Sequence, residues 1–169
     1  MKVLVADKFE KLGLDGLAAL GCTVANQPGL GTEKLGPALA SEKPDVLVVR
    51  STKVPAAVLE QAQGLKVIVR AGAGVDNIDV GAATARGIKV CNCPGMNAVA
   101  VAELAMGLLI CCDRRIPDQV AMQRSGQWSK KEFGKTGTGG ARGLKGMTLG
   151  VVGVGAIGQE VIKRAVAFG

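Results

Sequence analysis

Short apolar runs alternate with stretches of helical periodicity over about the first 90 residues. The runs are four or five residues long and rich in valine, which is typical of strands buried on both faces of a parallel sheet. The five predicted strands are Lys2–Ala6, Cys22–Ala25, Val46–Val49, Leu65–Val69 and Ile88–Cys91. The predicted helices cover Phe9–Leu20, residues 32–41, a segment that begins at Pro55, and residues 79–86. This alternation predicts an α/β fold with a doubly wound parallel sheet.

A long apolar stretch follows this alternation. Ala98–Cys112 contains one charged residue, Glu103, and predicts a helix that is apolar on nearly all sides and therefore buried. Asn97 is suited to the N-cap of this helix. The stretch is shorter than the roughly 20 residues that cross a bilayer, so we expect a core helix and no membrane contact.

The remaining residues predict the beginning of a second domain. After a break at residues 113–117, the pattern predicts a more polar helix as far as Trp128 and then an exposed loop over residues 129–143. Trp128 is either a packing anchor or part of a subunit interface. We therefore expect a first domain over residues 1–97 and the start of a second over residues 98–169.

A glycine-rich turn is the most specific local motif. The apolar run Leu149–Val152 predicts a buried strand, and apolar spacing from Ile157 onward predicts a helix. Between them stand Gly153, Gly155 and Gly158 in a Gly-x-Gly-x-x-Gly pattern. In dinucleotide-binding units these glycines permit a tight turn, close approach of the pyrophosphate and close helix packing. The strand and helix on either side favour a dinucleotide site over a plain turn between core elements. The acidic residue that holds a ribose about 20 residues further on is not in the sequence.

Three loops follow the predicted strands at the edge where doubly wound sheets bind ligands. Arg50-Ser51-Thr52-Lys53 suits a phosphate or carboxylate, with an exposed turn as an equal alternative. Arg70 precedes a loop with Gly72 and Gly74, whose amides could hold a carboxylate. Arg70 itself could instead pair with a nearby aspartate. The third loop ends at Asn97, which could contact a ligand as well as cap its helix.

Composition narrows the class of ligand. The net charge is +7, from 21 Lys and Arg against 14 Asp and Glu, but the charges are scattered and aromatic residues are few. A small anionic ligand fits this pattern better than nucleic acid. The sequence has no histidine, so the usual general base is missing. No leader pattern follows Met1, and the five cysteines are expected to be reduced thiols, both of which favour the cytoplasm. Cys91 and Cys93 lack partners for a metal site, so none is expected.

The order and spacing of these motifs resemble the D-isomer-specific 2-hydroxyacid dehydrogenases, most of all the D-3-phosphoglycerate dehydrogenase branch. The markers are Val49-Arg-Ser-Thr-Lys-Val54, Val69-Arg-Ala-Gly-Ala-Gly-Val-Asp-Asn-Ile-Asp79, Asn97 with Ala102-Glu103, Trp128, and Leu144-Lys-Gly-Met-Thr-Leu-Gly150 before the glycine turn. The resemblance implies a flavodoxin-like substrate-binding domain followed by the truncated start of a Rossmann NAD-binding domain. It implies oxidation of a phosphorylated 2-hydroxy acid, 3-phosphoglycerate, with NAD as cofactor, at the entry to serine biosynthesis.

The resemblance also implies a role for each matching position. The substrate-binding residues would be Arg50, Ser51, Thr52 (with Lys53 as help), Arg70, Gly72, Ala73, Gly74 and Asn97. The cofactor-binding residues would be Ala73, Gly153, Gly155, Ala156, Ile157 and Gly158. Two positions depart from common relatives, since Ala73 stands where Thr is frequent and Ala156 where Arg is frequent. A complete protein of this family would form a homodimer through an arm near residues 119–131 of the cofactor domain.

The family's catalytic Arg, Glu and His have no counterparts in these 169 residues. No catalytic residue is therefore assigned, and we expect an N-terminal portion that is inactive alone. Two alternatives stay open. One is a non-catalytic ligand-binding or dimerisation module, and the other is a portion of a different D-2-hydroxyacid dehydrogenase, such as a glyoxylate or hydroxypyruvate reductase.

Overall fold

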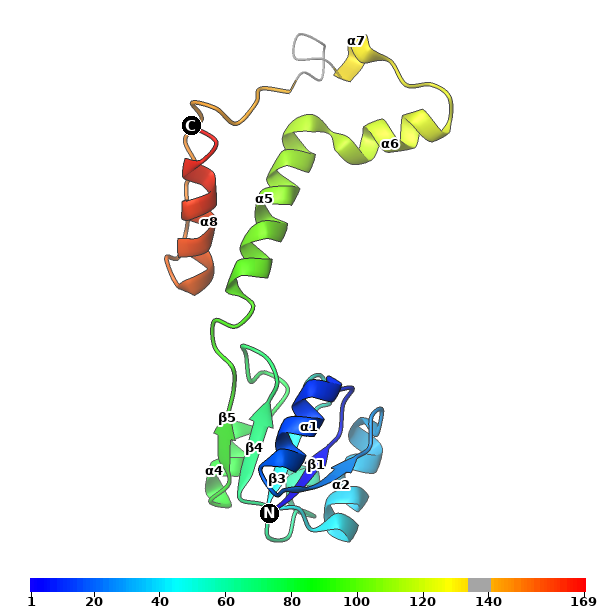
Figure 1. The fold of residues 1–169 in the computed structure, drawn as a ribbon, viewed down its shortest axis with the longest axis vertical. Coiled ribbons are helices and arrows are strands. Elements are labelled where there is room, and N and C mark those ends of the chain that lie inside the picture. The colour runs from blue at the N-terminus through cyan, green and yellow to red at the C-terminus, as the bar shows by residue number, and fades with distance from the viewer. Residues whose placement is uncertain (134–140) are drawn as a thin grey trace. The chain divides into compact units, whose positions relative to one another are not determined.

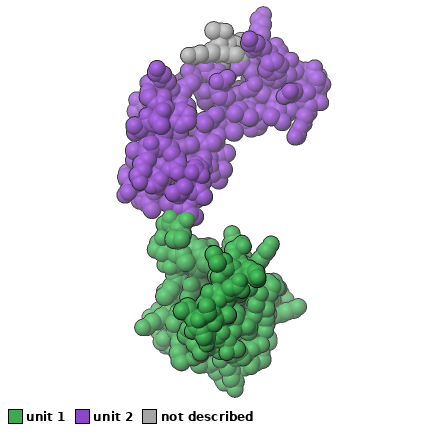
Figure 2. All heavy atoms as spheres, in the orientation of Figure 1, with its two compact units in different colours: residues 1–96 green, residues 97–169 purple. Residues whose placement is uncertain are grey.

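The computed structural model describes residues 1–133 and 141–169. They form two compact units, residues 1–96 and residues 97–169 (Figures 1 and 2).

The first unit contains a sheet of five parallel strands. These are β1 (Lys2–Val5), β2 (Thr23–Asn26), β3 (Val46–Val49), β4 (Val67–Arg70) and β5 (Lys89–Cys91). Their order across the sheet is β2-β1-β3-β4-β5, which is the flavodoxin-like order. The register places Leu4, Leu47, Ile68 and Val90 in one row across four strands. The predicted doubly wound parallel sheet is confirmed.

Helices connect the strands of this unit. They are α1 (Lys11–Ala19), α2 (Gly31–Glu42), α3 (Ala56–Leu59) and α4 (Val80–Ala85). Asp79 caps α4, because its Oδ1 accepts a hydrogen bond from the Ala82 amide at 2.8 Å. Gly87 follows α4 with a φ of 71°, a left-handed conformation that favours glycine and turns the chain toward β5.

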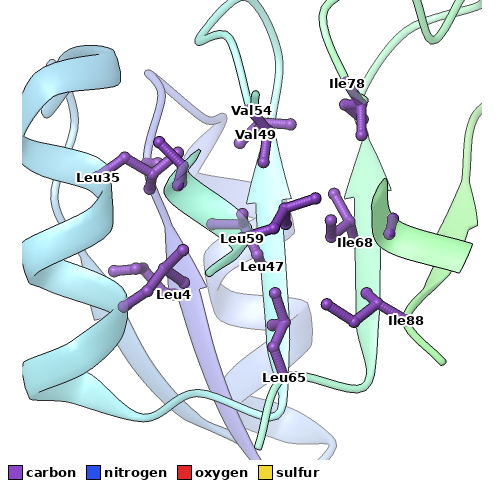
Figure 3. Close-up of a cluster of buried hydrophobic side chains, with 14 residues drawn as sticks. Leu4, Leu35, Leu47, Val49, Val54, Leu59, Leu65, Ile68, Ile78 and Ile88 are labelled. Atoms are coloured by element: carbon purple, nitrogen blue, oxygen red, sulfur yellow. The ribbon is translucent and has the colours of Figure 1, made fainter. Parts of the chain in front are cut away.

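Side chains bury on both faces of the sheet because successive residues of a strand point to opposite sides. On one face, Leu4 and its row pack against α2, α3 and α4 (Figure 3). On the other, Val3, Val5 and Val48 pack against Leu14 and Leu17 of α1. Burial on two faces explains why the strands read as continuous apolar runs.

The prediction for the first helix was only partly right. The structure has α1 over Lys11–Ala19, shorter than the predicted Phe9–Leu20. Leu12 and Leu20 are exposed, at 85% and 81% of their surface, so two of the four leucines that suggested the helix contribute nothing to the core. The helix nevertheless forms, because Leu14 and Leu17 bury its inner face.

The second unit is built on two helices that lie side by side. Its elements are α5 (Ala98–Arg114), α6 (Ile116–Arg124), α7 (Lys130–Phe133) and α8 (Ala156–Val166), and α5 packs against α8. An ion pair between Arg164 and Glu103, 3.0 Å apart, joins these two helices, and Arg164 also pairs with Glu160 at 2.7 Å.

Three predictions for the second unit need correction. The helix at 98–112 is not buried on all sides: Ala98, Ala102 and Met106 are buried, but Leu104 and Leu108 are largely exposed because α8 covers one side only. The predicted strand Leu149–Val152 is not formed, since none of the described residues pairs with it. The predicted loop over residues 129–143 contains α7, and its residues 134–140 lie outside the described part of the chain. In the ranges 1–133 and 141–169, no helix is long and apolar enough to cross a membrane.

Candidate functional site

The site begins where strands β1 and β3 end, side by side in the sheet. From β1 the chain leaves toward β2 on one side, while β3 and β4 lie on the other side, so this is a point where the direction of winding reverses. In doubly wound sheets, ligands bind beyond the carboxyl ends of the strands at such a point. Asp7 follows β1 here, and residues 50–53 follow β3.

The Asp7 carboxylate is surrounded by donors from the loop after β3. Its Oδ2 accepts hydrogen bonds from the amides of Arg50 (2.6 Å), Ser51 (3.1 Å) and Thr52 (3.0 Å). Its Oδ1 accepts from the hydroxyls of Ser51 (3.2 Å) and Thr52 (2.9 Å). Three successive amides aimed at one carboxylate form an anion-binding nest, and here the anion is a side chain of the protein itself.

These donors keep Asp7 ionised. Partial burial raises the pKa of Asp7, but the hydrogen bonds from Arg50, Thr52 and Ser51 together outweigh this effect, so its pKa lies below the ordinary value of 3.8. The carboxylate is therefore negatively charged at neutral pH.

Arg70 and Arg50 supply positive charge at this edge of the sheet. The Arg70 Nε donates to the Arg50 carbonyl oxygen at 3.0 Å, so the end of β4 is tied to the loop after β3. Among the described residues, neither arginine forms an ion pair. Arg70 thus does not pair with a nearby aspartate in the described part of the chain, and both guanidinium groups have unused donors.

Gly72 makes room for the Arg70 side chain. A Cβ at position 72 would lie 2.1 Å from Arg70 Nη1 and 2.5 Å from its Cζ, both far inside contact distance. Only a residue without a Cβ allows the guanidinium to lie over this part of the backbone. The requirement for glycine at position 72 therefore comes from a side chain and not from an unusual φ.

The second loop presents amides of its own. Within the described residues, the N–H groups of Ala73 and Gly74 have no acceptor, whereas the Gly72 amide donates to the Arg70 carbonyl at 2.8 Å. The Ala73 carbonyl is held by Asn92 Nδ2 at 2.6 Å, so the third loop supports the second. The two unused amides can donate to a small anion such as a carboxylate.

Two further contacts fix the first two loops together. Asn77 Nδ2 donates to the Thr52 carbonyl at 2.8 Å, and Val54 and Ile78 form a parallel β-bridge. Thr52 is almost fully buried, with 9% of its surface exposed. The loops are therefore a connected structure and not independent turns.

The glycine turn of the second unit has the geometry of an anion site. Gly153 has a φ of 91°, which only glycine adopts readily. A Cβ on Gly158 would lie 2.3 Å from the Gly153 carbonyl oxygen, so α8 approaches the turn as closely as backbone atoms allow. A Cβ on Gly155 would meet nothing within 4 Å, and the space beside it is open. The first amides of α8, from Ala156 onward, point out of the helix N-terminus, where pyrophosphate groups bind in other proteins.

The structure places the residues singled out in the sequence in two groups. Seven of them meet at one edge of the sheet in the first unit: Arg50, Ser51, Thr52, Arg70, Gly72, Ala73 and Gly74. The remaining six belong to the second unit: Asn97, Gly153, Gly155, Ala156, Ile157 and Gly158. Asn97 occupies the N-cap position of α5, but its side chain makes no capping hydrogen bond.

Asp7 was not among the residues expected in the site. Its signal in the sequence was a single carboxylate placed directly after an apolar run. That signal becomes specific only with the strand order, which brings β1 beside β3 and so brings residue 7 to residues 50–52.

Comparison with known proteins identifies the family of the chain. Residues 3–168 match the family model described as D-isomer specific 2-hydroxyacid dehydrogenase, catalytic domain. The chain is 46% identical over 172 residues to D-3-phosphoglycerate dehydrogenase of Methanocaldococcus jannaschii, covering 100% of this chain and 31% of that protein. It is 54% identical over 127 residues to hydroxypyruvate reductase of Thermotoga maritima, covering 74% of this chain and 39% of that protein.

A solved structure shows the same relation. The NAD-dependent formate dehydrogenase of Staphylococcus aureus, in complex with NAD, superimposes with a TM-score of 0.83 at 26% identity, over 99% of this chain and 54% of that one. The chain thus spans well under half the length of these two curated relatives and about half of this solved one. With a family model that matches nearly every residue and relatives that are identical at about half of the aligned positions, the chain belongs to the D-isomer-specific 2-hydroxyacid dehydrogenase family.

Proposed function

We propose that this chain supplies the substrate-binding part and the start of the cofactor-binding part of a cytoplasmic NAD-dependent 3-phosphoglycerate dehydrogenase of serine biosynthesis. The observation that carries the proposal is the position of Arg50 and Arg70 at one sheet edge, where the Arg70 side chain contacts the Arg50 carbonyl and neither arginine forms an ion pair with a described residue. Two charges of this kind are more than a lone carboxylate needs, and they suit a ligand that carries a phosphate as well.

The two ends of 3-phosphoglycerate would meet different donors in the first unit. The guanidinium groups of Arg50 and Arg70, with Lys53 nearby in sequence, would hold the phosphate. The amides of Ala73 and Gly74, which have no acceptor among residues 1–133 and 141–169, would hold the carboxylate. The hydroxyls of Ser51 and Thr52 both donate to Asp7, so these two residues would act by shaping the loop more than by touching the ligand.

The glycine turn fits the pyrophosphate of a dinucleotide. The open space beside Gly155, the close packing at Gly158 and the helix N-terminus that starts at Ala156 are the features that a pyrophosphate needs. When bound, NAD would supply the hydride acceptor. The residues of this chain would bind and orient it, and Ala73 would lie beside the nicotinamide, as the family pattern implies.

Turnover by the 169-residue chain alone is not expected. The sequence contains no histidine, and the resemblance assigns the family's catalytic Arg, Glu and His to none of its residues. Incubation of the pure chain with 3-phosphoglycerate and NAD should therefore produce no NADH above background. Steady NADH formation that follows the protein peak on a sizing column would contradict this.

Substrate binding can be tested without turnover. Isothermal titration of the chain with 3-phosphoglycerate and with glycerate should show that the phosphorylated acid binds more tightly. Arg50→Ala should weaken binding of 3-phosphoglycerate by about tenfold or more, through loss of a charge-assisted contact of about 1.5–3 kcal/mol. Arg86→Ala is the matched control: it removes the same charge from the residue after α4, which hydrogen-bonds its own helix and pairs with Glu60.

The same titration decides the second candidate, a reductase for an unphosphorylated 2-oxo acid. The 54% identity to a hydroxypyruvate reductase favours it. In that case glycerate or glyoxylate would bind as tightly as 3-phosphoglycerate, and Arg50→Ala would leave their affinities unchanged.

We also propose that the complete protein forms a homodimer through its second unit, where Ile116, Val120 and Trp128 line an exposed hollow. Light scattering after size exclusion would measure this, and a strictly monomeric complete protein would refute it.

A further inference from the structure

We infer that Asp7 is a positioning residue: it fills the amide nest of the loop after β3 with its own carboxylate, and so directs the substrate anion to the arginine side chains. The effect on substrate binding rests on the proposed function, whereas the contact of Asp7 with residues 50–52 is a feature of the fold. Nothing in the local sequence around Asp7 marks it as part of a ligand site.

The nest is complete without any ligand. The three amides of residues 50–52 all converge on one oxygen of Asp7, and the two hydroxyls of Ser51 and Thr52 converge on the other. A loop that presents three amides at the end of a strand would ordinarily be read as a phosphate cradle. Here Asp7 accepts hydrogen bonds from all five donors, so none of them is left for the anion of a ligand.

Asp7 is held in the nest by connectivity as well as by hydrogen bonds. It follows β1 directly, and β1 pairs with β3 in register, with Val5 opposite Val48. An anion tethered in this way has a high local concentration and competes strongly with a dissolved one. The low pKa of Asp7 agrees with a carboxylate that stays charged in this position.

The loop after β3 also contacts side chains from the next loop, including Arg70, which would touch the substrate. The carbonyl of Arg50 accepts from Arg70 Nε at 3.0 Å, and the carbonyl of Thr52 accepts from Asn77 Nδ2 at 2.8 Å. When Asp7 holds the amides of these residues, it also sets the direction of their neighbouring peptide groups. Loss of the carboxylate should therefore displace Arg70 although Asp7 does not contact it.

Chemical rescue provides the test. Asp7→Ala leaves the nest empty, and added acetate can refill it with a carboxylate that is not tethered. In the variant we expect the NMR amide signals of Ser51 and Thr52 to move from their wild-type positions, and 3-phosphoglycerate to bind about tenfold more weakly. Increasing acetate should return the amide signals toward wild-type positions in a saturable way and recover at least half of the lost binding free energy.

Two other variants separate positioning from general stability. Asp7→Asn fills the same space without a charge, and acetate should not rescue it. Asp45→Ala removes a carboxylate at the opposite edge of the sheet, where Asp45 accepts from the Lys2 amide (2.9 Å) and Lys66 Nζ (2.7 Å). It should lower stability without changing the affinity for 3-phosphoglycerate, and acetate should have no effect.

The outcomes are distinguishable. If Asp7→Ala binds 3-phosphoglycerate as tightly as wild type, the inference is overturned, because the carboxylate then has no effect on the substrate site. If the variant binds more tightly, the inference is overturned as well, because Asp7 then only keeps the ligand out of the nest. If acetate fails to shift the amide signals of a variant that is folded by circular dichroism, it is overturned as well. If the wild-type chain itself binds no 3-phosphoglycerate, the proposed function fails, and the acetate response of the amides still decides the role of Asp7.

Discussion

Gly72→Ala is the substitution that most directly separates binding from folding at this site. The new Cβ would lie 2.1 Å from Arg70 Nη1, 2.5 Å from Cζ and 3.0 Å from Nε. All three atoms belong to the flexible end of one side chain, so the guanidinium can swing away while the backbone stays in place. We therefore expect the variant to fold normally and to lose the arginine from the site.

The magnitudes follow from the contacts involved. Displacing Arg70 breaks its hydrogen bond to the Arg50 carbonyl, a loss of about 1 kcal/mol of stability. Gly72 does not have a positive φ, so alanine is compatible with its backbone and restricts the unfolded chain, a gain of about 0.4–1 kcal/mol. The two nearly cancel, and the free energy of unfolding should change by less than about 1 kcal/mol. Affinity for 3-phosphoglycerate should fall about ten- to a hundredfold, since a charge-assisted contact of about 1.5–3 kcal/mol is lost.

A double-mutant cycle makes the reasoning refutable. Arg70→Ala and Gly72→Ala should each weaken binding to a similar extent, and the double variant should bind no more weakly than either one, because both remove the same guanidinium. Urea unfolding supplies the stability values, and calorimetric titration supplies the affinities. Gly16→Ala, in α1 with open space around it, is the control: it should unfold at slightly higher urea and bind normally. Additive losses, or a Gly72→Ala variant destabilised by several kcal/mol, would show that the loop backbone and not Arg70 needs the glycine.

Three further predictions concern stability and the glycine turn. Ile68→Ala removes a fully buried side chain from the centre of the sheet and should lower the free energy of unfolding by about 2–5 kcal/mol in urea titrations; a loss below about 1 kcal/mol would mean that this core is not close-packed. The pKa of Asp7 is lower in the folded chain than its ordinary value of 3.8, so the folded state binds fewer protons at this carboxyl than the unfolded state does. The contribution of Asp7 to the free energy of unfolding is therefore fully present above pH 3.8 and is lost as the pH falls through the lower pKa of the folded state. Urea unfolding from pH 6 down to pH 3 should show this loss, and an equally steep loss in Asp7→Asn would assign it to other carboxyls. Gly158→Ala sets a Cβ 2.3 Å from the Gly153 carbonyl oxygen, a backbone atom that cannot swing aside, so hydrogen exchange in α8 should become faster; Gly107→Ala, with open space in α5, should not have this effect.

The sheet could be predicted because both of its faces are covered. Val46–Val49 lies between β1 and β4 and packs on both sides, so every position in it must be apolar, and the sequence shows that directly. The helices were harder to place, since a short amphipathic helix needs few buried residues. In α1, Leu14 and Leu17 are enough, and the exposed Leu12 and Leu20 made the predicted helix too long.

The sequence predicts where the loops of the site lie, but not which of their residues contact one another. Their edge of the sheet follows from the direction of the strands, which is why Arg50, Arg70 and Gly72 were singled out. The contact of Asp7 with residues 50–52 joins positions 43 to 45 apart and depends on the strand order, which no local pattern contains. The role of Gly72 likewise depends on where one arginine side chain lies, and a glycine in a loop has many possible reasons.

The two runs Val46–Val49 and Leu149–Val152 show that an apolar pattern is necessary for a strand but does not form one. Both are four-residue segments that lead into a loop, yet the first pairs with neighbours on both sides and the second with none of the described residues. Strand hydrogen bonds form only between neighbouring strands, so a segment without a neighbour forms no strand and leaves side chains exposed. Val49, in a paired strand covered by helices, is fully buried, whereas Val152 is fully exposed. The exposed side of α5 has the same cause, since an apolar helix is buried only where another element covers it, and α8 covers one side.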